Sequence, residues 1–92
     1  MPYYIDLVLK TLNECIRNKV NIITVKSIRK RNGIESSDKC KINFIWRNLE
    51  FLEKYGFIEI YNNKIPKRYK LPQTEIKIQE VRDIVIKNTR NQ

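Results

Sequence analysis

A chain of 92 residues is long enough for one compact domain and too short for two, and its 41% hydrophobic and 32% charged residues are typical of a globular protein. No apolar run approaches the roughly 18 residues of a membrane-spanning helix, and the first residues lack a signal-peptide pattern, so we expect a cytoplasmic protein without membrane contact. With no histidine and only two cysteines and two glycines, the chain lacks the usual components of zinc sites, histidine-based catalysis and glycine-rich phosphate loops. We therefore expect no enzyme, metal, cofactor or small-molecule ligand.

The positive charge is concentrated in the middle of the chain. Of a formal net charge of +9, residues 17–70 account for all, with 14 Lys and Arg against 5 Asp and Glu, whereas the two flanks together hold 5 of each. A basic centre between neutral ends is expected of a surface that faces phosphates. The pattern therefore predicts a nucleic-acid-binding middle region and a different task for the ends.

Apolar residues at helical spacing predict the first two helices. From residue 3 to about 18, one stripe repeats every three or four residues. It consists of Ile5, Val8, Leu9, Leu12 and Ile16. After a connector or small strand at 20–23, Thr24 offers its hydroxyl as the N-cap of a short helix over 25–32, which ends at Gly33 because glycine readily adopts the left-handed conformation of a helix end.

A third helix, ending at Gly56, is the clearest predicted element. Its apolar positions follow a 3-4-3 rhythm. They are Ile42, Ile45, Leu49 and Leu52. Ser36, Ser37 and Asp38 are all candidate N-caps: a cap at Ser37 gives a long helix, whereas a looser first turn starts it near Lys41. The spacing thus predicts the end of this helix more sharply than its start.

Beyond Gly56 the pattern changes to short β-prone runs, which predict a hairpin. Its strands are expected over 57–61 and 68–71. The connecting residues include two asparagines and Pro66, which suit a turn, and Pro72 closes the hairpin.

Three helices followed by a basic hairpin is the element order of a winged helix-turn-helix, in which the third helix lies in the DNA major groove. The run Ile45-x-x-x-Leu49-x-x-Leu52-x-x-x-Gly56-Phe57-Ile58 resembles a pattern of winged-helix regulators, with an apolar residue, two leucines and a tight glycine-led entry to the wing. Over roughly residues 5–71 the chain is similar to the PadR and MarR types and to small archaeal chromatin-associated winged-helix proteins. The resemblance implies an α+β, mostly α fold in a single domain over 1–92, with a winged-helix core at 5–71 and an additional C-terminal helix at 73–90.

The outer face of the third helix is the predicted recognition surface. If the apolar stripe faces the core, a turn of about 100° per residue leaves Asn43, Arg47, Glu50 and Lys54 outside. Arg47 has the geometry to pair with guanine and Asn43 with adenine. The candidate DNA contacts on this helix are Lys39, Lys41, Asn43, Phe44, Trp46 and Arg47. The alternative interpretation is the solvated polar face that every amphipathic helix has.

The second helix and the hairpin supply the predicted electrostatic contacts. A wing runs along the phosphate backbone or dips into the minor groove, and the first helix of a helix-turn-helix pair crosses the backbone. The candidate wing residues are Lys64, Lys67, Arg68 and Lys70. The candidate backbone anchors on the second helix are Lys26, Arg29, Lys30 and Arg31.

Two sets of side chains leave alternatives open. Phe44, Trp46 and Phe51 either pack in the core or against a second subunit, or stack on a base or contact the sugar and phosphate. Cys15 and Cys40 are either small apolar residues in a reducing compartment or the two halves of a disulfide.

The neutral ends carry apolar residues beyond a single stripe, which predicts a homodimer. A fourth helix is expected from 74 to about 89, with Ile76 and Ile86 outside its stripe. The candidate interface residues are Leu7, Ile76, Ile78, Val81, Ile84 and Val85. A two-fold pair would bind half-sites about one helical turn apart. The alternative is a monomer in which the fourth helix packs over the first.

Three functions compete at the level of sequence. The leading hypothesis is a sequence-specific regulator of transcription that binds double-stranded DNA in the nucleoid. The second is an architectural or DNA-partition protein with little sequence preference. The third is a protein-interaction module within a larger replication or transcription assembly, because fold alone does not fix function.

Overall fold

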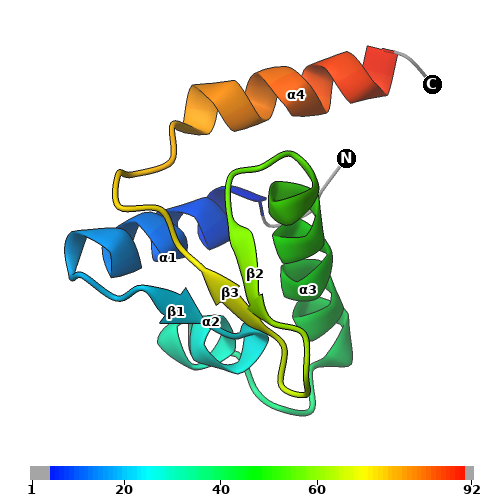
Figure 1. The fold of residues 1–92 in the computed structure, drawn as a ribbon. Helices are drawn as coiled ribbons and strands as arrows, with labels where there is room; N and C mark the ends of the chain where they lie inside the picture. The colour runs from blue at the N-terminus through cyan, green and yellow to red at the C-terminus, as the bar shows by residue number, and fades with distance from the viewer. Residues whose placement is uncertain (1–4, 91–92) are drawn as a thin grey trace.

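The computed structural model describes residues 5–90, which form four helices and one small antiparallel sheet (Figure 1). In chain order the elements are α1 (Ile5–Arg17), β1 (Ile22–Ile23), α2 (Val25–Arg31), α3 (Lys39–Lys54), β2 (Glu59–Asn62), β3 (Arg68–Lys70) and α4 (Ile78–Arg90). The mostly helical α+β class expected from the sequence is confirmed. Residues 3 and 4, where the first helix was expected to begin, lie outside the described part.

The sheet has β3 in the middle, in the order β1-β3-β2. Tyr69 of β3 is paired with Ile23 on one side and Ile60 on the other, both antiparallel, and a bulge between Ile60 and Asn62 interrupts the hairpin ladder. The connector expected at 20–23 therefore includes a strand, β1. Because β1 pairs with β3 just before α2 begins, this pairing attaches the start of α2 to the hairpin.

The core lies where the apolar faces of α1, α2 and α3 meet the inner face of the sheet. All five residues of the predicted α1 stripe are buried, as are Ile45, Leu49 and Leu52 of α3, while Ile42 is half-buried. Figure 1 shows α4 lying over α1 at one end of the molecule, with α2, the N-terminal end of α3 and the tip of the hairpin at the other. None of the described helices is long and apolar enough to cross a membrane.

The predicted helix ends of α2 and α3 are confirmed in detail. The hydroxyl of Thr24 accepts from the Ser27 N–H at 3.1 Å, and the Ser27 hydroxyl oxygen accepts from the Thr24 N–H at 2.8 Å, which forms a reciprocal capping box. Of the three candidate caps for α3, Asp38 is the one used. Gly33 and Gly56 follow the two helices with φ of +64° and +80°, a region that other residues enter at a cost.

The hairpin strands are displaced from their predicted bounds of 57–61 and 68–71. Phe57 belongs to the turn that ends α3, since its N–H donates to the Leu52 carbonyl at 2.9 Å, and Ile58 turns into the core. At the other end, the Leu71 N–H bonds to the Asn21 carbonyl at 2.7 Å outside the strand ladder. Phe57 and Leu71 thus use their backbone N–H groups for bonds to other segments, and the paired part of the hairpin is shorter than predicted.

The predicted start of the fourth helix at residue 74 is wrong, because α4 begins at Ile78. The preceding segment is held extended on α1 by Asn13, a buried side chain that acts as a backbone partner. Its amide Nδ2 donates to the Ile76 carbonyl at 3.0 Å, and its Oδ1 accepts from the Ile76 N–H at 2.7 Å. An exposed ion pair between Arg17 and Glu75 lies beside this anchor. Ile76 is consequently buried in the core, although it precedes α4 and is not part of that helix.

The two cysteines are free in this structure, so the disulfide alternative is not realised. Cys15 is buried on α1, and burial raises the pKa of its thiol, only partly opposed by the positive charge of Arg31. Cys40 is exposed on the first turn of α3.

Candidate nucleic-acid interface

Side chains at the C-terminal end of α2 bond to α1 and to the turn that leads to α3. Asn32 donates through Nδ2 to the Ile28 carbonyl at 2.8 Å and to the Thr11 hydroxyl at 3.0 Å, which links the end of α2 to α1. The Arg29 guanidinium donates to the Ile34 carbonyl at 2.9 Å. These bonds attach the end of α2 to α1 and to the first residues of the turn.

The cations predicted on α2 divide into two kinds. Lys26, Lys30 and Arg31 are exposed, and none of them forms an ion pair with another residue of the described chain. Arg29 is half-buried and holds the turn described above. Three of the four predicted anchors are therefore exposed and outside any ion pair of the described residues, while the fourth supports the fold.

The charges of α3 are separated along its length. Its first nine residues, 39–47, contain three cations and no acidic residue, whereas residues 48–54 contain Glu50 and Glu53 against a single lysine. Lys39, Asn43 and Arg47 are exposed, as predicted for the outer face, whereas Lys41 is exposed but lies 3.4 Å from the Asp38 carboxylate. We call residues 39–47 the cationic half of α3. A polyanion approaching this helix meets attraction at its N-terminal end and repulsion near its C-terminal end.

The aromatic residues of α3 point to different environments. Phe51 packs against the core, with its ring centroid 4.9 Å from that of Tyr55, and Phe44 is half-buried. Trp46 remains 43% exposed. By helical geometry, Trp46 and Glu53 lie on one side of the outer face of α3. Phe44 and Phe51 lie on the opposite side of that face. Core packing thus accounts for Phe51, while Trp46 remains accessible within the cationic half.

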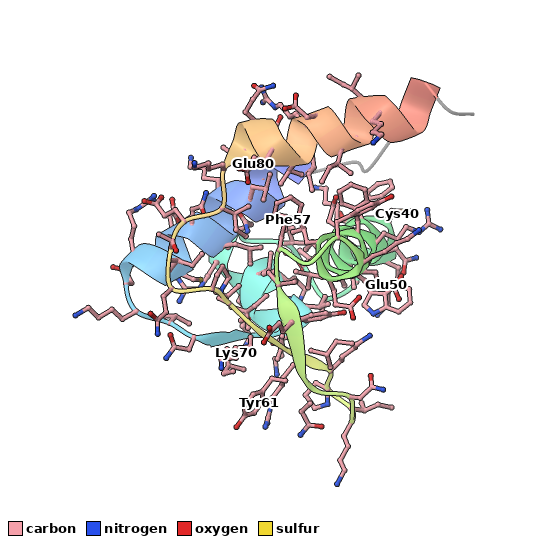
Figure 2. All side chains as sticks on the ribbon, turned by 45° about the horizontal axis from the view of Figure 1, so that its top comes forward. Cys40, Glu50, Phe57, Tyr61, Lys70 and Glu80 are labelled. Atoms are coloured by element: carbon pink, nitrogen blue, oxygen red, sulfur yellow. The ribbon has the colours of Figure 1, made fainter. Side chains whose placement is uncertain are left out.

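The hairpin projects beyond the helices, as Figure 2 shows in a view nearly along α3. Its cations Lys64, Arg68 and Lys70 are exposed. The ammonium of Lys67 lies 5.5 Å from the centroid of the Tyr69 ring, a cation–π distance, and this side chain is half-buried. Arg68 and Lys70 alternate with the buried Tyr69 along β3, so they share the outer face of the sheet.

Tyr69 is a feature that the sequence did not single out. It is fully buried in the central strand, and no hydrogen-bond partner for its hydroxyl lies within residues 5–90. Burial raises the pKa of its phenol to about 12, with a further contribution from the negative charges of Glu50 and Glu53. The same two carboxylates that make the C-terminal part of α3 acidic therefore lie near the middle strand of the sheet.

Replacing Tyr69 by phenylalanine is expected to raise the free energy of unfolding by about 1 kcal/mol, because a buried hydroxyl without a partner loses hydration and gains nothing in return. The raised pKa also makes stability depend on pH, because the folded protein holds the phenol proton more tightly than the unfolded chain does. The free energy of unfolding should therefore be independent of this phenol below about pH 10 and fall between about pH 10 and 12, where the unfolded chain ionises first. Urea unfolding near pH 9 and pH 11 tests both effects, with Tyr61→Phe, at an exposed position, as the matched control. An equal alkaline loss in Tyr69→Phe and in the wild type would contradict this account.

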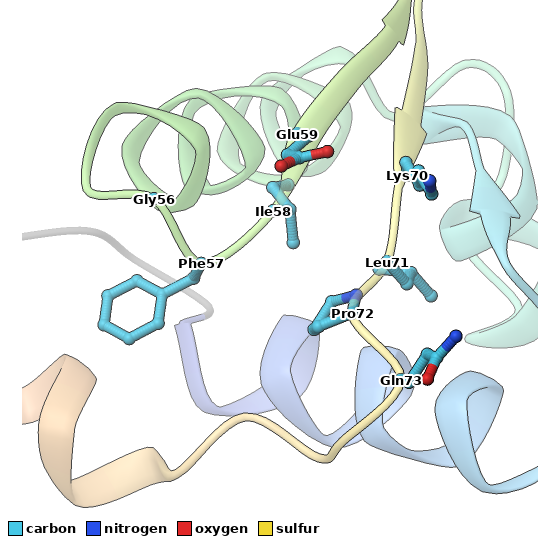
Figure 3. Close-up of a pocket in the computed structure, with 8 residues that line it drawn as sticks. All are labelled: Gly56, Phe57, Ile58, Glu59, Lys70, Leu71, Pro72 and Gln73. Carbon is cyan, nitrogen blue, oxygen red and sulfur yellow. The ribbon is translucent and has the colours of Figure 1, made fainter.

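A cavity of about 220 Å³ opens at the base of the hairpin, between the start of β2 and the end of β3 (Figure 3). Ile58 and Leu71 form part of its apolar lining, and Glu59 and Lys70, which are register partners, bring one charge of each sign. The cavity lies at the opposite end of the hairpin from Lys64 and the turn, so it is separate from the cationic half of α3.

The six residues predicted for a subunit interface do not form one exposed surface. Ile76, Val81 and Val85 are buried within the chain, because α4 and the preceding segment close over α1. Leu7 and Ile84 are half-buried, and Ile78 is 37% exposed. Ile86, expected outside the stripe, is 52% exposed. Any contact with a second subunit on this face must therefore use Ile78, Ile86 and their half-buried neighbours, not the residues already packed in the core.

Comparisons of the chain with models of protein families, with curated proteins and with solved structures found no match.

Proposed function

We propose that this chain is a winged helix-turn-helix protein that binds double-stranded DNA. The succession α1-β1-α2-α3-β2-β3 and a sheet ordered β1-β3-β2 support this assignment, with α2 and α3 as the helix pair and the hairpin as the wing. The observation that carries the proposal is a set of exposed cations on three elements that lie at the same end of the molecule (Figure 1). None of these cations forms an ion pair with another residue of the described part of the chain. They are Lys26, Lys30 and Arg31 of α2, Lys39 and Arg47 of α3, and Lys64 and Arg68 of the hairpin.

The polarity of α3 favours one way of docking. Recognition helices of this class contact base edges mainly with their N-terminal residues. In this chain those residues are the cationic half, where Asn43 and Arg47 offer the hydrogen-bonding groups that match adenine and guanine. Glu50 lies on the same outer face one turn further on and repels phosphates there. The N-terminal end of α3 therefore enters the major groove, and its C-terminal end tilts away from the backbone.

The best-supported role is a sequence-specific regulator of transcription, acting on DNA in the cytoplasm. An architectural or DNA-partition protein would use the same cations but would not need base contacts. Fragments selected from random DNA by the protein should compete with unselected DNA at a stated salt concentration, and a regulator should prefer the selected fragment by roughly 10³-fold or more. Equal affinities would instead identify the architectural role, and weak, salt-insensitive binding would identify a protein-interaction module.

Replacing Arg47 by alanine is expected to weaken binding to a selected fragment by roughly 1–3 kcal/mol and to reduce the preference at one base pair. Replacing Arg68 by alanine should weaken binding to selected and unselected DNA alike, since a phosphate contact carries no sequence information. Lys54→Ala, on the same face of α3 but beyond the cationic half, is the matched control and should change little. Competition titrations of the three variants measure these effects, and no loss for Arg47→Ala would remove Arg47 from the site.

A homodimer through α4 is part of the proposal, with a contact centred on the exposed Ile78 and Ile86. Sedimentation equilibrium should then give about twice the chain mass of 11.1 kDa. Substituting both isoleucines by glutamate should give the monomer mass, because a charge in an apolar contact loses its hydration. The exposed Thr74→Glu is the control and should leave the dimer intact. A monomer mass for the wild type would contradict a two-fold arrangement and its palindromic target.

A further inference from the structure

The tip of the hairpin exposes an apolar side chain completely. Ile65 is 100% exposed, compared with 61% for Tyr61 and 52% for Ile86, the next most exposed large apolar residues in the described part of the chain. It belongs to the turn that joins β2 to β3. This turn is the far end of the projecting hairpin (Figure 2). A whole isoleucine side chain is therefore free to be buried by a partner.

The surroundings of Ile65 are uniformly positive. Residues 60–74 contain four cations and no acidic residue, and Lys64 and Lys67 flank the Ile65-Pro66 pair on either side. Lys67 is held against the Tyr69 ring, whereas Lys64 is exposed beside the isoleucine. An apolar side chain flanked by lysines is complementary to a polyanion that has an apolar interior.

The turn carries two local restraints. The Asn62 Oδ1 accepts from the Lys64 N–H at 2.9 Å, and the ring of Pro66 fixes one backbone dihedral next to Ile65. Each restraint lowers the conformational entropy that the tip loses when Ile65 is buried by a partner.

From these features we infer that Ile65 is a wedge that the hairpin inserts into the minor groove of duplex DNA, partly unstacking a base step and bending the duplex. The inference rests on the proposed DNA-binding function and adds to it the groove, the wedging residue and the deformation. Apolar wedges between base steps are the known means by which side chains kink DNA from the minor groove, while neighbouring cations contact the phosphates. The same positive charge continues onto α2 and the cationic half of α3, and Ile65 is the one large apolar side chain exposed in the turn 63–67. Both points favour DNA over an anionic lipid surface as the partner.

The test measures how far the protein bends a DNA duplex and varies the chemical groups that the duplex exposes in its minor groove. A duplex selected by the protein is labelled at its two ends, and energy transfer between the labels is measured for the wild type, Ile65→Ala and Ile65→Leu. The segment that faces the hairpin is made with A·T, G·C or inosine·cytosine pairs. Inosine lacks the amino group that guanine places in the minor groove, while its major-groove edge resembles that of guanine.

We expect the wild type to bend the A·T and inosine·cytosine duplexes and to bind both better than the G·C duplex. Ile65→Ala should lose the bend and bind these duplexes roughly tenfold less tightly with an unchanged salt slope, whereas Ile65→Leu should retain both properties. A bend that is unaffected by Ile65→Ala, or an inosine·cytosine duplex that behaves like the G·C one, would overturn the wedge while leaving DNA binding intact. Loss of salt-dependent DNA binding in every variant, the wild type included, would instead refute the proposed function itself.

Vesicles that contain anionic lipid form the second arm of the same experiment. Tight binding of the wild type to these vesicles that is lost in Ile65→Ala, with DNA bending unaltered, would assign the tip to a lipid surface and overturn the inference. Because Ile65 is fully exposed, the variants should unfold at the same urea concentration as the wild type, so that these differences report on binding.

Discussion

Replacing Lys26, Lys30 and Arg31 together by glutamine is expected to weaken binding to any duplex by about 10²–10³-fold at about 0.1 M salt, the effect of losing roughly three phosphate contacts. The reason is that all three side chains are exposed and carry charge that no partner in the described chain neutralises. The slope of log K against log salt should fall by about 2.7 for the same reason. Fluorescence anisotropy over a series of salt concentrations measures both quantities.

A second triple variant tests whether the loss of affinity depends on where the removed charges lie or only on how many are removed. Lys10, Lys77 and Lys87 are exposed on the neutral flanks, so replacing all three by glutamine lowers the net charge by the same amount at a distance from α2. This control should keep the salt slope of the wild type. If both triple variants lost affinity equally, binding would depend on overall charge, and the assignment of α2 as a backbone anchor would be refuted.

Replacing Asn13 by leucine is expected to lower the free energy of unfolding by about 2–5 kcal/mol, because it leaves the N–H and the carbonyl of the buried Ile76 without partners. The segment that leads to α4 should then detach from α1. Hydrogen exchange should report this locally, as faster exchange at residues 76–85, and urea unfolding should report it globally.

Two further variants make the effect of Asn13 specific. Asn18 lies just beyond the end of α1 and is exposed, and its side chain bonds to the Glu14 carbonyl, so Asn18→Ala should change stability by less than about 0.5 kcal/mol. Asn13→Asp keeps the acceptor for the Ile76 N–H but buries a carboxylate against the Ile76 carbonyl, so at neutral pH its loss should be at least as large as that of Asn13→Leu. Stability of Asn13→Leu equal to that of the wild type would contradict the anchoring of α4 through this side chain.

The parts of the fold that the sequence predicted are those set by local chemistry. The stripe from Ile5 to Ile16 predicted α1 because a helix repeats its inner face every three to four residues. Thr24, Gly33 and Gly56 marked helix ends because capping and positive φ depend on one or two residues. The exposure of Asn43 and Arg47 followed from the same periodicity.

The parts that were missed depend on contacts between distant residues. Asn13 reaches Ile76 across 63 positions, and nothing in the local pattern around either residue signals that pairing or the late start of α4 that results. Asn48 is buried on α3 and donates to the Phe44 carbonyl, although its residue type suggests exposure. The burial of Tyr69 in the middle strand likewise arises only when β1 pairs with β3. The prediction of a subunit contact is wrong for Ile76, Val81 and Val85, because the sequence pattern identifies apolar residues but not the element that covers them.

The central claim is that duplex DNA binds to the end of the molecule formed by α2, the cationic half of α3 and the hairpin. Titration of the isotopically labelled protein with a short duplex, followed by the shifts of its backbone amide resonances, tests this residue by residue. We predict shifts concentrated at residues 25–31, 39–47 and 62–68, with α4 and the N-terminal half of α1 unaffected. Shifts confined to α1 and α4, or no shifts at low salt, would contradict the account.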